Sequence, residues 1–411
     1  METLTQDATA VRRTTDRAGS ADRRGLRVAL AIAALALGGF AIGTTEFVTM
    51  GLLPDISQGV GVDIPTGGHL ISAYALGVVV GAPVIAALGA RLPRRRLALG
   101  LMGAFLLGNA LTALAPSYGT LLLARVVAGL PHGAYFGVAS LVAASLVPEG
   151  ARGRAVSSVM LGLAVANLAG VPAATWLGQT LGWRAAYWAV VAAAAATLLA
   201  VGLLVPHAPA APGAGVRTEL GALRRPQVLL TLLTGVVGFG GMFAVYSYIA
   251  PITTEVARAG AGFVPVVLLA FGGGGIAGTA LGGRLADRAV VPALFGEGVA
   301  MGAVLACVPV LAHSAVGVVV AVLLISVAGS ALAVCLQMRL MAVAGDAQMI
   351  GAALNHSALN LANALGAWLG GAVIAAGLGW TAPALVGAVL SVAGLLVLGA
   401  SALVARRPAT A

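Results

Sequence analysis

The segment GVVVGAPVIAALGAR, residues 77–91, has a counterpart in GGIAGTALGGRLADR, residues 274–288. Four positions are identical, and each pair is separated by 197 residues (274 − 77 = 197). The same offset maps Gly182-Trp183 onto Gly379-Trp380. Because one offset fits two distant places, the chain contains an internal duplication. The repeat is far longer than the roughly 20–50 residues of solenoid repeats, so we expect two large, equivalent halves.

The composition predicts that most of the protein faces lipid. Hydrophobic residues make up 60% of the 411 residues and charged residues only 9%, whereas soluble domains carry about 25% charged residues. Apolar segments of about 20 residues, enough to cross a bilayer as a helix, recur along the chain. They are too long and continuous for barrel strands, the other structure that can span a membrane. We expect spans near 28–51, 66–89, 97–115, 119–146, 155–179, 184–205, 228–250, 262–285, 291–312, 315–339, 348–376 and 380–404.

Six spans fall in each copy of the repeat. This predicts an all-α membrane protein of 12 transmembrane helices in two six-helix bundles, residues 27–205 and 228–405. Residues 206–227, whose first half is rich in Pro and Gly, are expected to form a linker. Residues 1–26 are polar and are expected to be a disordered tail, and residues 406–411 a short second tail. Repeated membrane units of this kind are typical of secondary transporters, whose site lies between the repeats.

The basic residues predict the orientation in the membrane. The net charge is +10 and all 23 basic residues are arginine. One set of connections holds only Arg184 and Arg258, and Arg125 lies inside a span. Since cytoplasmic connections are enriched in basic residues, we expect both termini and the linker to be cytoplasmic, in the inner or plasma membrane, with no nucleic-acid partner. The other twenty lie in the tails, the linker or alternate connections: six between Arg12 and Arg27, then Arg91, Arg94, Arg95, Arg96, Arg152, Arg154, Arg217, Arg224, Arg225, Arg284, Arg288, Arg339, Arg406 and Arg407.

Two ionisable residues inside spans form the leading candidate site. Glu46 lies 19 residues beyond Arg27, or about 28 Å along a helix. Arg125 lies eight residues after Ser117, about 12 Å from the other end of its own span. Both could therefore share one depth, where opposite charges attract in a low dielectric. Ionisable groups within a membrane are functional hypotheses by default, so we interpret the pair as a proton-binding carboxylate with a basic partner. The alternatives are a structural ion pair, or a Glu46 that reaches the outer water.

Other polar and aromatic residues within spans could bind a small molecule. For each, packing or hydrogen bonding between helices is an alternative role. Glu297 lies close to the inner end of its span and is expected to extend to that surface, and His356 is a weaker candidate than His132. The candidates for substrate binding are Tyr74, His132, Tyr135, Phe136, Asn167, Phe243, Tyr246, Asn355 and Asn363.

Several other functional classes lack their motifs in this sequence. It has no Gly-Lys-Ser/Thr nucleotide loop, no Cys/His spacing for a metal and no Gly-x-Ser-x-Gly elbow, so we expect no cofactor, no metal and no enzymatic activity. A channel would need a continuous polar path, and a receptor would need a sizeable soluble domain. Both classes stay as alternatives to a transporter.

Four stretches resemble a known family. They are 44–56 (TTEFVTMGLLPDI), 71–83 (ISAYALGVVVGAP), 125–133 and 355–371. On these residues the chain resembles the major facilitator superfamily, and within it the twelve-span drug:proton antiporters of the arabinose-efflux-permease and chloramphenicol-resistance exporter group. The likeness extends from the first span to the twelfth.

The resemblance also implies gating residues. The superfamily signature Gly-x-x-x-Asp-Arg-x-Gly-Arg-Arg is incomplete in the first copy, where Ala90 stands at the Asp position and Pro93 at the second Gly position. A cytoplasmic latch would therefore rely on the second copy. The antiporter signature of the fifth span, normally Gly-Pro, reads Gly170-Val171-Pro172. The matching latch residues are Arg91, Arg94 and Arg95 in the first copy and Gly283, Asp287 and Arg288 in the second.

What the resemblance implies is alternating access, with proton entry driving substrate exit. Glu46 would exchange its proton for substrate, and Arg125 would tune that carboxylate. We expect a monomeric exporter of a small, largely apolar molecule, with chloramphenicol-like drugs leading. Its partners would be that molecule, protons and the lipid bilayer. Export of a sugar or nucleoside, and import by proton symport, stay open.

Overall fold

The computed structural model describes residues 2–89, 92–148, 151–206, 224–344 and 348–405, and over these ranges every regular element is a helix. Twelve helices are long and apolar enough to cross a membrane, as predicted. They lie at Gly25–Gly51, Ile64–Ala82, Arg94–Leu114, Tyr118–Ser145, Arg154–Leu181, Trp183–Leu204, Pro226–Tyr246, Ala261–Ala286, Arg288–Leu311, Ala315–Ala344, Leu354–Ala375 and Ala382–Ala405.

The first six spans form one bundle. Its elements are α1 (Glu2–Gly51), α2 (Leu53–Gly59), α3 (Ile64–Gly67), α4 (His69–Gly89), α5 (Arg94–Leu114), α6 (Tyr118–Gly129), α7 (His132–Ser145), α8 (Arg152–Val165), the π-helix η2 (Ala166–Gly170), α9 (Val171–Leu181) and α10 (Trp183–Leu204). The fourth span comprises α6 and α7, which meet at Leu130 and Pro131 because proline lacks a backbone N–H and favours a helix start. The fifth span comprises α8, η2 and α9.

The last six spans form the second bundle. Its elements are α12 (Pro226–Tyr246), α13 (Ile249–Pro251), η3 (Ile252–Val256), η4 (Ala261–Phe263), α14 (Val264–Leu311), α15 (Ala315–Ala344), α16 (Gln348–Ala375) and α17 (Ala382–Ala405). α14 contains two spans, separated at Ala289 by extended backbone angles. Residues 207–223 of the predicted linker and the tail 406–411 lie outside the described residues.

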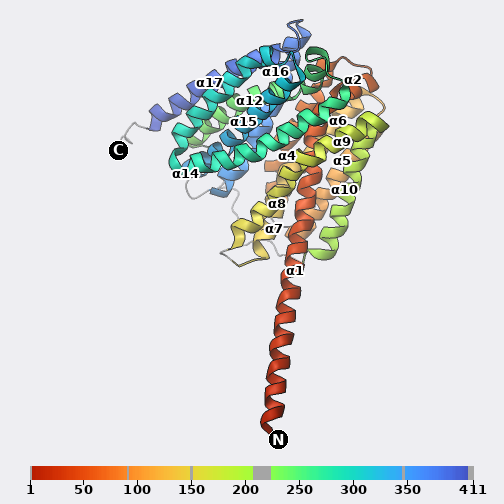
Figure 1. Ribbon diagram of the computed structural model, residues 1–411, viewed down its shortest axis with the longest axis vertical. Coiled ribbons are helices and arrows are strands. Elements are labelled where there is room, and N and C mark those ends of the chain that lie inside the picture. The colour runs from red at the N-terminus through yellow and green to blue at the C-terminus, as the bar shows by residue number, and fades with distance from the viewer. Residues whose placement is uncertain (1, 90–91, 149–150, 207–223, 345–347, 406–411) are drawn as a thin grey trace.

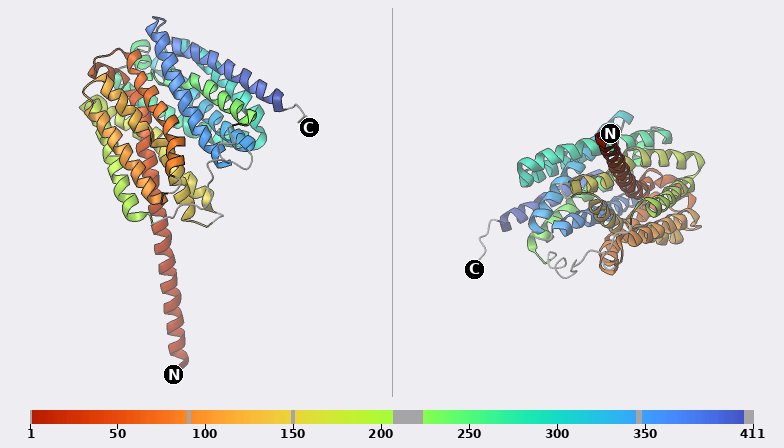
Figure 2. Two further views of the ribbon diagram at one scale, coloured as in Figure 1. Left: turned by 180° about the vertical axis from the view of Figure 1, so that it is seen from behind. Right: turned by 90° about the horizontal axis from the view of Figure 1, so that it is seen from below.

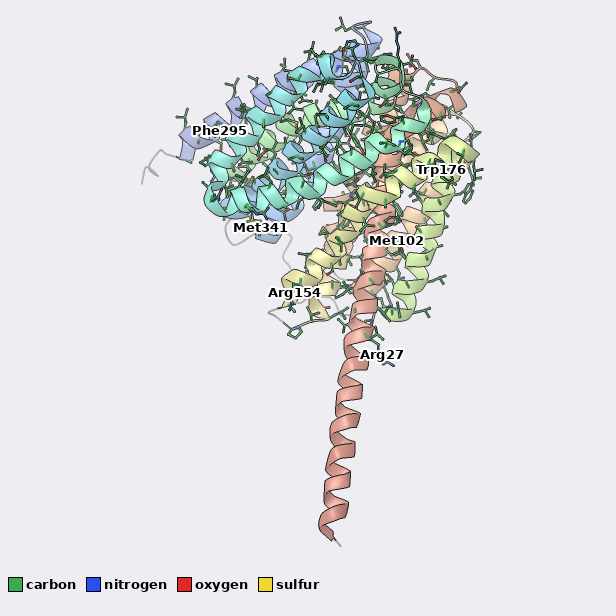
Figure 3. All side chains as sticks on the ribbon, in the orientation of Figure 1. Arg27, Met102, Arg154, Trp176, Phe295 and Met341 are labelled. Atoms are coloured by element: carbon green, nitrogen blue, oxygen red, sulfur yellow. The ribbon has the colours of Figure 1, made fainter. Side chains whose placement is uncertain are left out.

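The two bundles meet at one end and diverge at the other. Figures 1 and 2 show them close together around α2 and α16, and further apart toward the end from which the N-terminal part of α1 projects. α4 packs on α16, and α14 packs on η2 and α9. Arg27 and Arg154 lie toward the diverging end, whereas Trp176 lies toward the opposite end (Figure 3). We refer below to the closed end and the diverging end.

The duplication is confirmed in three dimensions. Gly182 and Gly379, which the 197-residue offset pairs, both adopt positive φ angles, 90° and 87°, a conformation that favours glycine. Glycines of the second and eighth spans also make equivalent close approaches to the backbone of the fourth and tenth spans. These contacts pair Gly77 with Val126 and Gly81 with Leu130 in one half, and Gly274 with Leu323 and Gly278 with Val327 in the other.

These close approaches predict opposite effects for two otherwise similar substitutions. A Cβ atom at Gly81 would overlap the backbone of Leu130, while one at Gly100 would meet nothing within 4 Å. Gly81→Ala should destabilise the protein by about 1–3 kcal/mol, the usual cost of overpacking. Gly100→Ala should be neutral or stabilising by up to about 1 kcal/mol, because alanine favours a helix. Thermal unfolding of both variants in one detergent measures the difference, and a destabilised Gly100→Ala would contradict this explanation.

The N-terminal segment differs from the expected disordered tail. α1 continues back to Glu2, so residues 2–24 form a helix that projects beyond the bundle (Figure 1). The segment has no proline and only two glycines. It extends an existing helix, so it needs no new nucleation, which is the costly step in helix formation. Polarity favours exposure to water, but it does not by itself prevent helix formation.

Candidate transport site between the two bundles

Glu46 and Arg125 form a buried charged site in the first bundle. Glu46 on α1 is 6% exposed, and Arg125 on α6 is 0% exposed. The Arg125 charge acts on the Glu46 carboxyl, but its guanidinium hydrogen-bonds to backbone oxygens, from Nη1 to Thr45 at 3.4 Å and from Nε to Leu70 at 3.5 Å. Its buried Nη2 has no hydrogen-bond partner. Arg125 is therefore held beside Glu46 with hydrogen-bonding capacity to spare.

Neutral side chains complete the surroundings of Arg125. The guanidinium carbon lies 4.3 Å from the centre of the Tyr74 ring and 5.8 Å from that of Tyr187, in the arrangement of cation–π contacts. The Thr45 hydroxyl donates to Oδ1 of Asn109. The sequence interpretation missed Tyr187 and Asn109 because neutral residues on separate helices show no charge or spacing pattern.

A line of rings leads from this site to the second bundle. The Tyr74 hydroxyl and Nδ1 of His132 are hydrogen-bonded at 3.1 Å. The His132 ring lies 5.4 Å from Phe136. Phe136 in turn is stacked on His356 of α16, with ring centres 6.1 Å apart and an interplanar angle of 5°. The structure thus brings together Tyr74, His132 and Phe136 and extends them across the bundle interface.

Aromatic residues also join the bundles on a second path. Phe47 of α1 meets Tyr246 of α12 edge-on, with ring centres 5.8 Å apart. Tyr246 is stacked on Phe271 of α14 at 3.8 Å. Phe243, also on α12, lies against Gly366 of α16 within the second bundle. Of these predicted residues, Tyr246 lies at the interface of the bundles.

Three predicted asparagines carry buried polar atoms without hydrogen-bond partners. These atoms are Oδ1 of Asn167, Oδ1 of Asn355, and both Oδ1 and Nδ2 of Asn363. Asn167 lies in η2, whose backbone contacts Gly272 of the second bundle. Asn363 precedes Ala364, whose carbonyl accepts a hydrogen bond from Ser72 at 3.0 Å. Buried polar groups are normally paired, so these amides are available to a bound molecule at or near the interface.

Tyr135 has a different environment from the other candidates. Its hydroxyl donates to the Leu35 carbonyl at 3.0 Å, and its ring packs against Gly38. These contacts join α7 to α1 inside the first bundle. The structure therefore gives Tyr135 a packing role and does not place it beside His356 or Tyr246.

Glu297 is not at the surface where the sequence interpretation expected it. It is only 7% exposed within α14. Its position in the span gave its depth, but burial also depends on which way the helix is rotated. It therefore provides a second buried carboxylate with which Glu46 can be compared.

The gating residues of the first copy bond within their own bundle. Nη1 of Arg94 donates to Leu141 at 3.5 Å, and Nη2 of Arg95 donates to Gly202. Arg288 is exposed and Gly283 lies within α14. Arg91 and the side chain of Asp287 lie outside the described part of the structure. The predicted latch is therefore described only in part, and the hydrogen bonds of Arg94 and Arg95 do not join the bundles.

The antiporter-like stretch of the fifth span has an unusual helix geometry. Residues Ala166–Gly170 form the π-helix η2, and Pro172 is at the start of α9. Single π turns often occur at functional sites. A Cβ at Gly170 would overlap Thr44 and Phe40 of α1. This span therefore depends on Gly170 for its close approach to the helix that carries Glu46.

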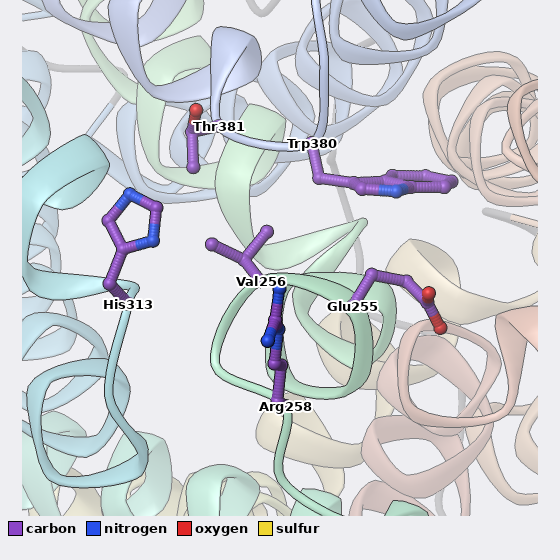
Figure 4. A pocket seen from close by; sticks show the side chains of 6 residues that line it. All are labelled: Glu255, Val256, Arg258, His313, Trp380 and Thr381. Carbon is purple, nitrogen blue, oxygen red and sulfur yellow. The ribbon is translucent and has the colours of Figure 1, made fainter.

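A cavity of about 480 Å³ lies elsewhere, at the closed end of the second bundle. Figure 4 shows its lining side chains. They come from η3 and from the loops that precede α15 and α17. None belongs to the predicted site, and over the described ranges no cluster of three or more metal-ligating side chains is found. The cavity residues are Glu255, Val256, Arg258, His313, Trp380 and Thr381.

Comparison with known proteins decides the family. The model of the Major Facilitator Superfamily matches residues 35–354. The chain belongs to the Major Facilitator Superfamily. Relatives in this superfamily include an Escherichia coli K12 protein described as inner membrane transport protein YdhP, which is 44% identical over 377 residues, covering 92% of this chain and 97% of the relative. The chain is therefore a multi-pass membrane transporter of this superfamily.

Two further relatives have more specific or different names. A Streptomyces lividans protein described as a chloramphenicol resistance protein is 41% identical over 258 residues, 62% of this chain and 66% of the relative. An E. coli K12 protein described as putative transporter AraJ is 34% identical over 366 residues, 89% of this chain and 93% of the relative. The resemblance inferred from the sequence motifs is thus confirmed at the level of the superfamily.

Proposed function

We propose that the protein is a proton-coupled antiporter that exports a small, largely apolar organic molecule, with chloramphenicol-like drugs the leading class. The observation that carries the proposal is the buried Glu46 beside the fully buried Arg125. A carboxylate in the membrane interior is costly, and it can be retained because it binds and releases a proton. The similarity to a chloramphenicol resistance protein supports the substrate class.

The candidate surface for substrate fits such a molecule. Its rings, at Phe136 and Tyr246, offer apolar contact, while the unpaired amides of Asn167, Asn355 and Asn363 offer hydrogen bonds. Ligand sites commonly combine apolar walls with a few placed polar groups. Binding would compete with the protonated state of Glu46, so that an inward proton is exchanged for an outward substrate.

The shape of the molecule supports the alternating-access mechanism. We infer that the closed end is the outer side and the diverging end is the cytoplasmic side, because Arg27 and Arg154 lie toward the latter (Figure 3) and basic residues favour the cytoplasm. The structure then corresponds to an inward-facing carrier. Rocking of one bundle on the other would open the outer side, as in other repeat-based transporters.

Transport by purified protein in liposomes tests this proposal. A pH gradient, acid on the outer-equivalent side, should drive labelled chloramphenicol toward the acid side, and a protonophore should abolish the movement. Empty liposomes and liposomes with Glu46→Gln protein serve as controls. Movement of the drug along with the protons would indicate symport. No gradient-dependent movement of chloramphenicol, sugars or nucleosides would reject proton-coupled export of these substrate classes.

The orientation can be tested separately in intact cells. Cysteines introduced by Ala211→Cys and Ala409→Cys should be protected from a membrane-impermeant thiol reagent and become labelled when the cells are opened. A Thr381→Cys variant provides the opposite case, because residue 381 lies at the closed end and should be labelled from outside. The native residues Cys307 and Cys335 are first replaced by serine. Labelling of residues 211 and 409 in intact cells would reverse the proposed orientation.

A further inference from the structure

We propose that Tyr74 and His132 form the route by which the proton bound to Glu46 leaves the first bundle toward the interface. This inference rests on the proposed proton coupling and adds a defined path to it. Glu46 and Arg125 are buried, so a proton released from the carboxyl needs neighbouring groups that can accept and donate it. The hydrogen-bonded Tyr74–His132 pair is placed to do this.

Tyr74 connects the charged site to the histidine. Arg125 lies over its ring at 4.3 Å, and both Glu46 and Arg125 act electrostatically on its phenol group. The same phenol oxygen is 3.1 Å from Nδ1 of His132. A hydroxyl can accept one proton while it donates another, so Tyr74 has the chemistry of a relay and not only of a wall.

His132 connects Tyr74 to the second bundle. Its ring is followed by Phe136 and then by His356, which is half-buried on α16. The titratable and charged groups around His132 are Tyr74 from α4 and His356 from α16, with Arg125 of α6 and Glu46 of α1 beyond Tyr74. His132 is therefore the group of the first bundle through which the charged site and the interface communicate.

The duplication supplies an internal comparison. The 197-residue offset places four apolar residues where the first half has its four polar ones. In the second half, the counterpart of Tyr74 has no hydroxyl and stacks on Tyr246 instead. The polar groups thus occur as a set in one copy and are absent as a set from the other. The pairs are Glu46 with Phe243, Tyr74 with Phe271, Arg125 with Val322, and His132 with Gly329.

The proposed transfer conserves protons. The proton leaves the Glu46 carboxyl for the Tyr74 oxygen as Tyr74 gives its own proton to Nδ1 of His132. The imidazolium formed then loses a proton from Nε2 to water, and the ring returns to its initial tautomer before the next cycle. Arg125 stabilises the carboxylate that remains. Imidazole suits this task because it can accept and donate protons near neutral pH.

The test separates proton transfer from substrate binding. Gradient-driven export needs a proton to be released in every cycle, whereas exchange of labelled for unlabelled chloramphenicol at equal pH does not. In Tyr74→Phe and in His132→Gln, the ratio of the gradient-driven rate to the exchange rate should fall at least about tenfold, since acid–base groups typically contribute about 10²–10⁴ in rate. Both rates are measured in the same liposomes.

A matched tyrosine–histidine pair provides the control. His69 and Tyr118 are also hydrogen-bonded at 3.1 Å, but they lie near the closed end, away from Arg125. His69→Gln and Tyr118→Phe should leave the ratio unchanged. The proposal is overturned if His132→Gln lowers exchange and gradient-driven export equally, which would indicate substrate binding, or if it changes neither. A wild-type protein that ignores the pH gradient would reject the proton-coupled function itself.

Discussion

Replacement of Glu46 by glutamine should abolish gradient-driven export. The amide resembles the protonated carboxyl, so the carrier can no longer take up and release a proton. An electrogenic exchange of one proton for a neutral substrate is driven by about 2.3 kcal/mol per 100 mV, which supports roughly fifty-fold accumulation at about 1.4 kcal/mol per tenfold. Glu46→Gln should reduce this accumulation to equality across the membrane.

Substrate binding should distinguish a missing proton site from a misfolded protein. Glu46→Gln should still bind chloramphenicol, and its affinity should no longer decrease in acid, because the competing protonation has been removed. Binding is measured between about pH 5 and 8 in detergent, alongside the wild type. Glu297→Gln is a matched control, since Glu297 is also a buried carboxylate within a span, at 7% exposure against 6% for Glu46. Normal accumulation by Glu46→Gln would move the proton to another group.

The fold could be predicted from the sequence because its determinants are local or periodic. The length of each apolar segment indicated a span, and a constant offset revealed two halves. The depth of Glu46 and Arg125 also followed from the fixed rise per residue of a helix. These quantities do not depend on how the helices are rotated or on how the bundles meet.

Other features of the site depend on rotation and docking. Tyr135 and Phe136 are adjacent in sequence, yet one packs within the first bundle and the other is stacked on His356. Glu297 was placed at a plausible depth but on the wrong face. Contacts such as Ser72 with Ala364 join residues 292 positions apart, and no pattern along the chain encodes them. Only the assembled bundles show which candidates lie together.

Linking the two bundles at their closed end should stop transport completely. Nε2 of Gln179 in the first bundle donates to the Ala261 carbonyl of the second at 2.9 Å, so these positions are close in the present conformation. If the outer side must open in every cycle, a covalent bridge between them holds the carrier inward-facing. Gln179→Cys and Ala261→Cys, combined in a protein without Cys307 and Cys335, provide sites for a short, reducible bifunctional reagent.

The same reagent applied within one bundle distinguishes rocking from general damage. Nη2 of Arg184 donates to Ala115 at 3.0 Å within the first bundle, so Ala115→Cys with Arg184→Cys gives a bridge that rigid-body rocking would not strain. This control should keep its transport rate after cross-linking. The 179–261 bridge should abolish transport and reduction of the linker should restore it, because motion between the bundles, and not their internal structure, exposes the site to the two sides in turn. Undiminished transport across an intact 179–261 bridge would exclude opening at this end.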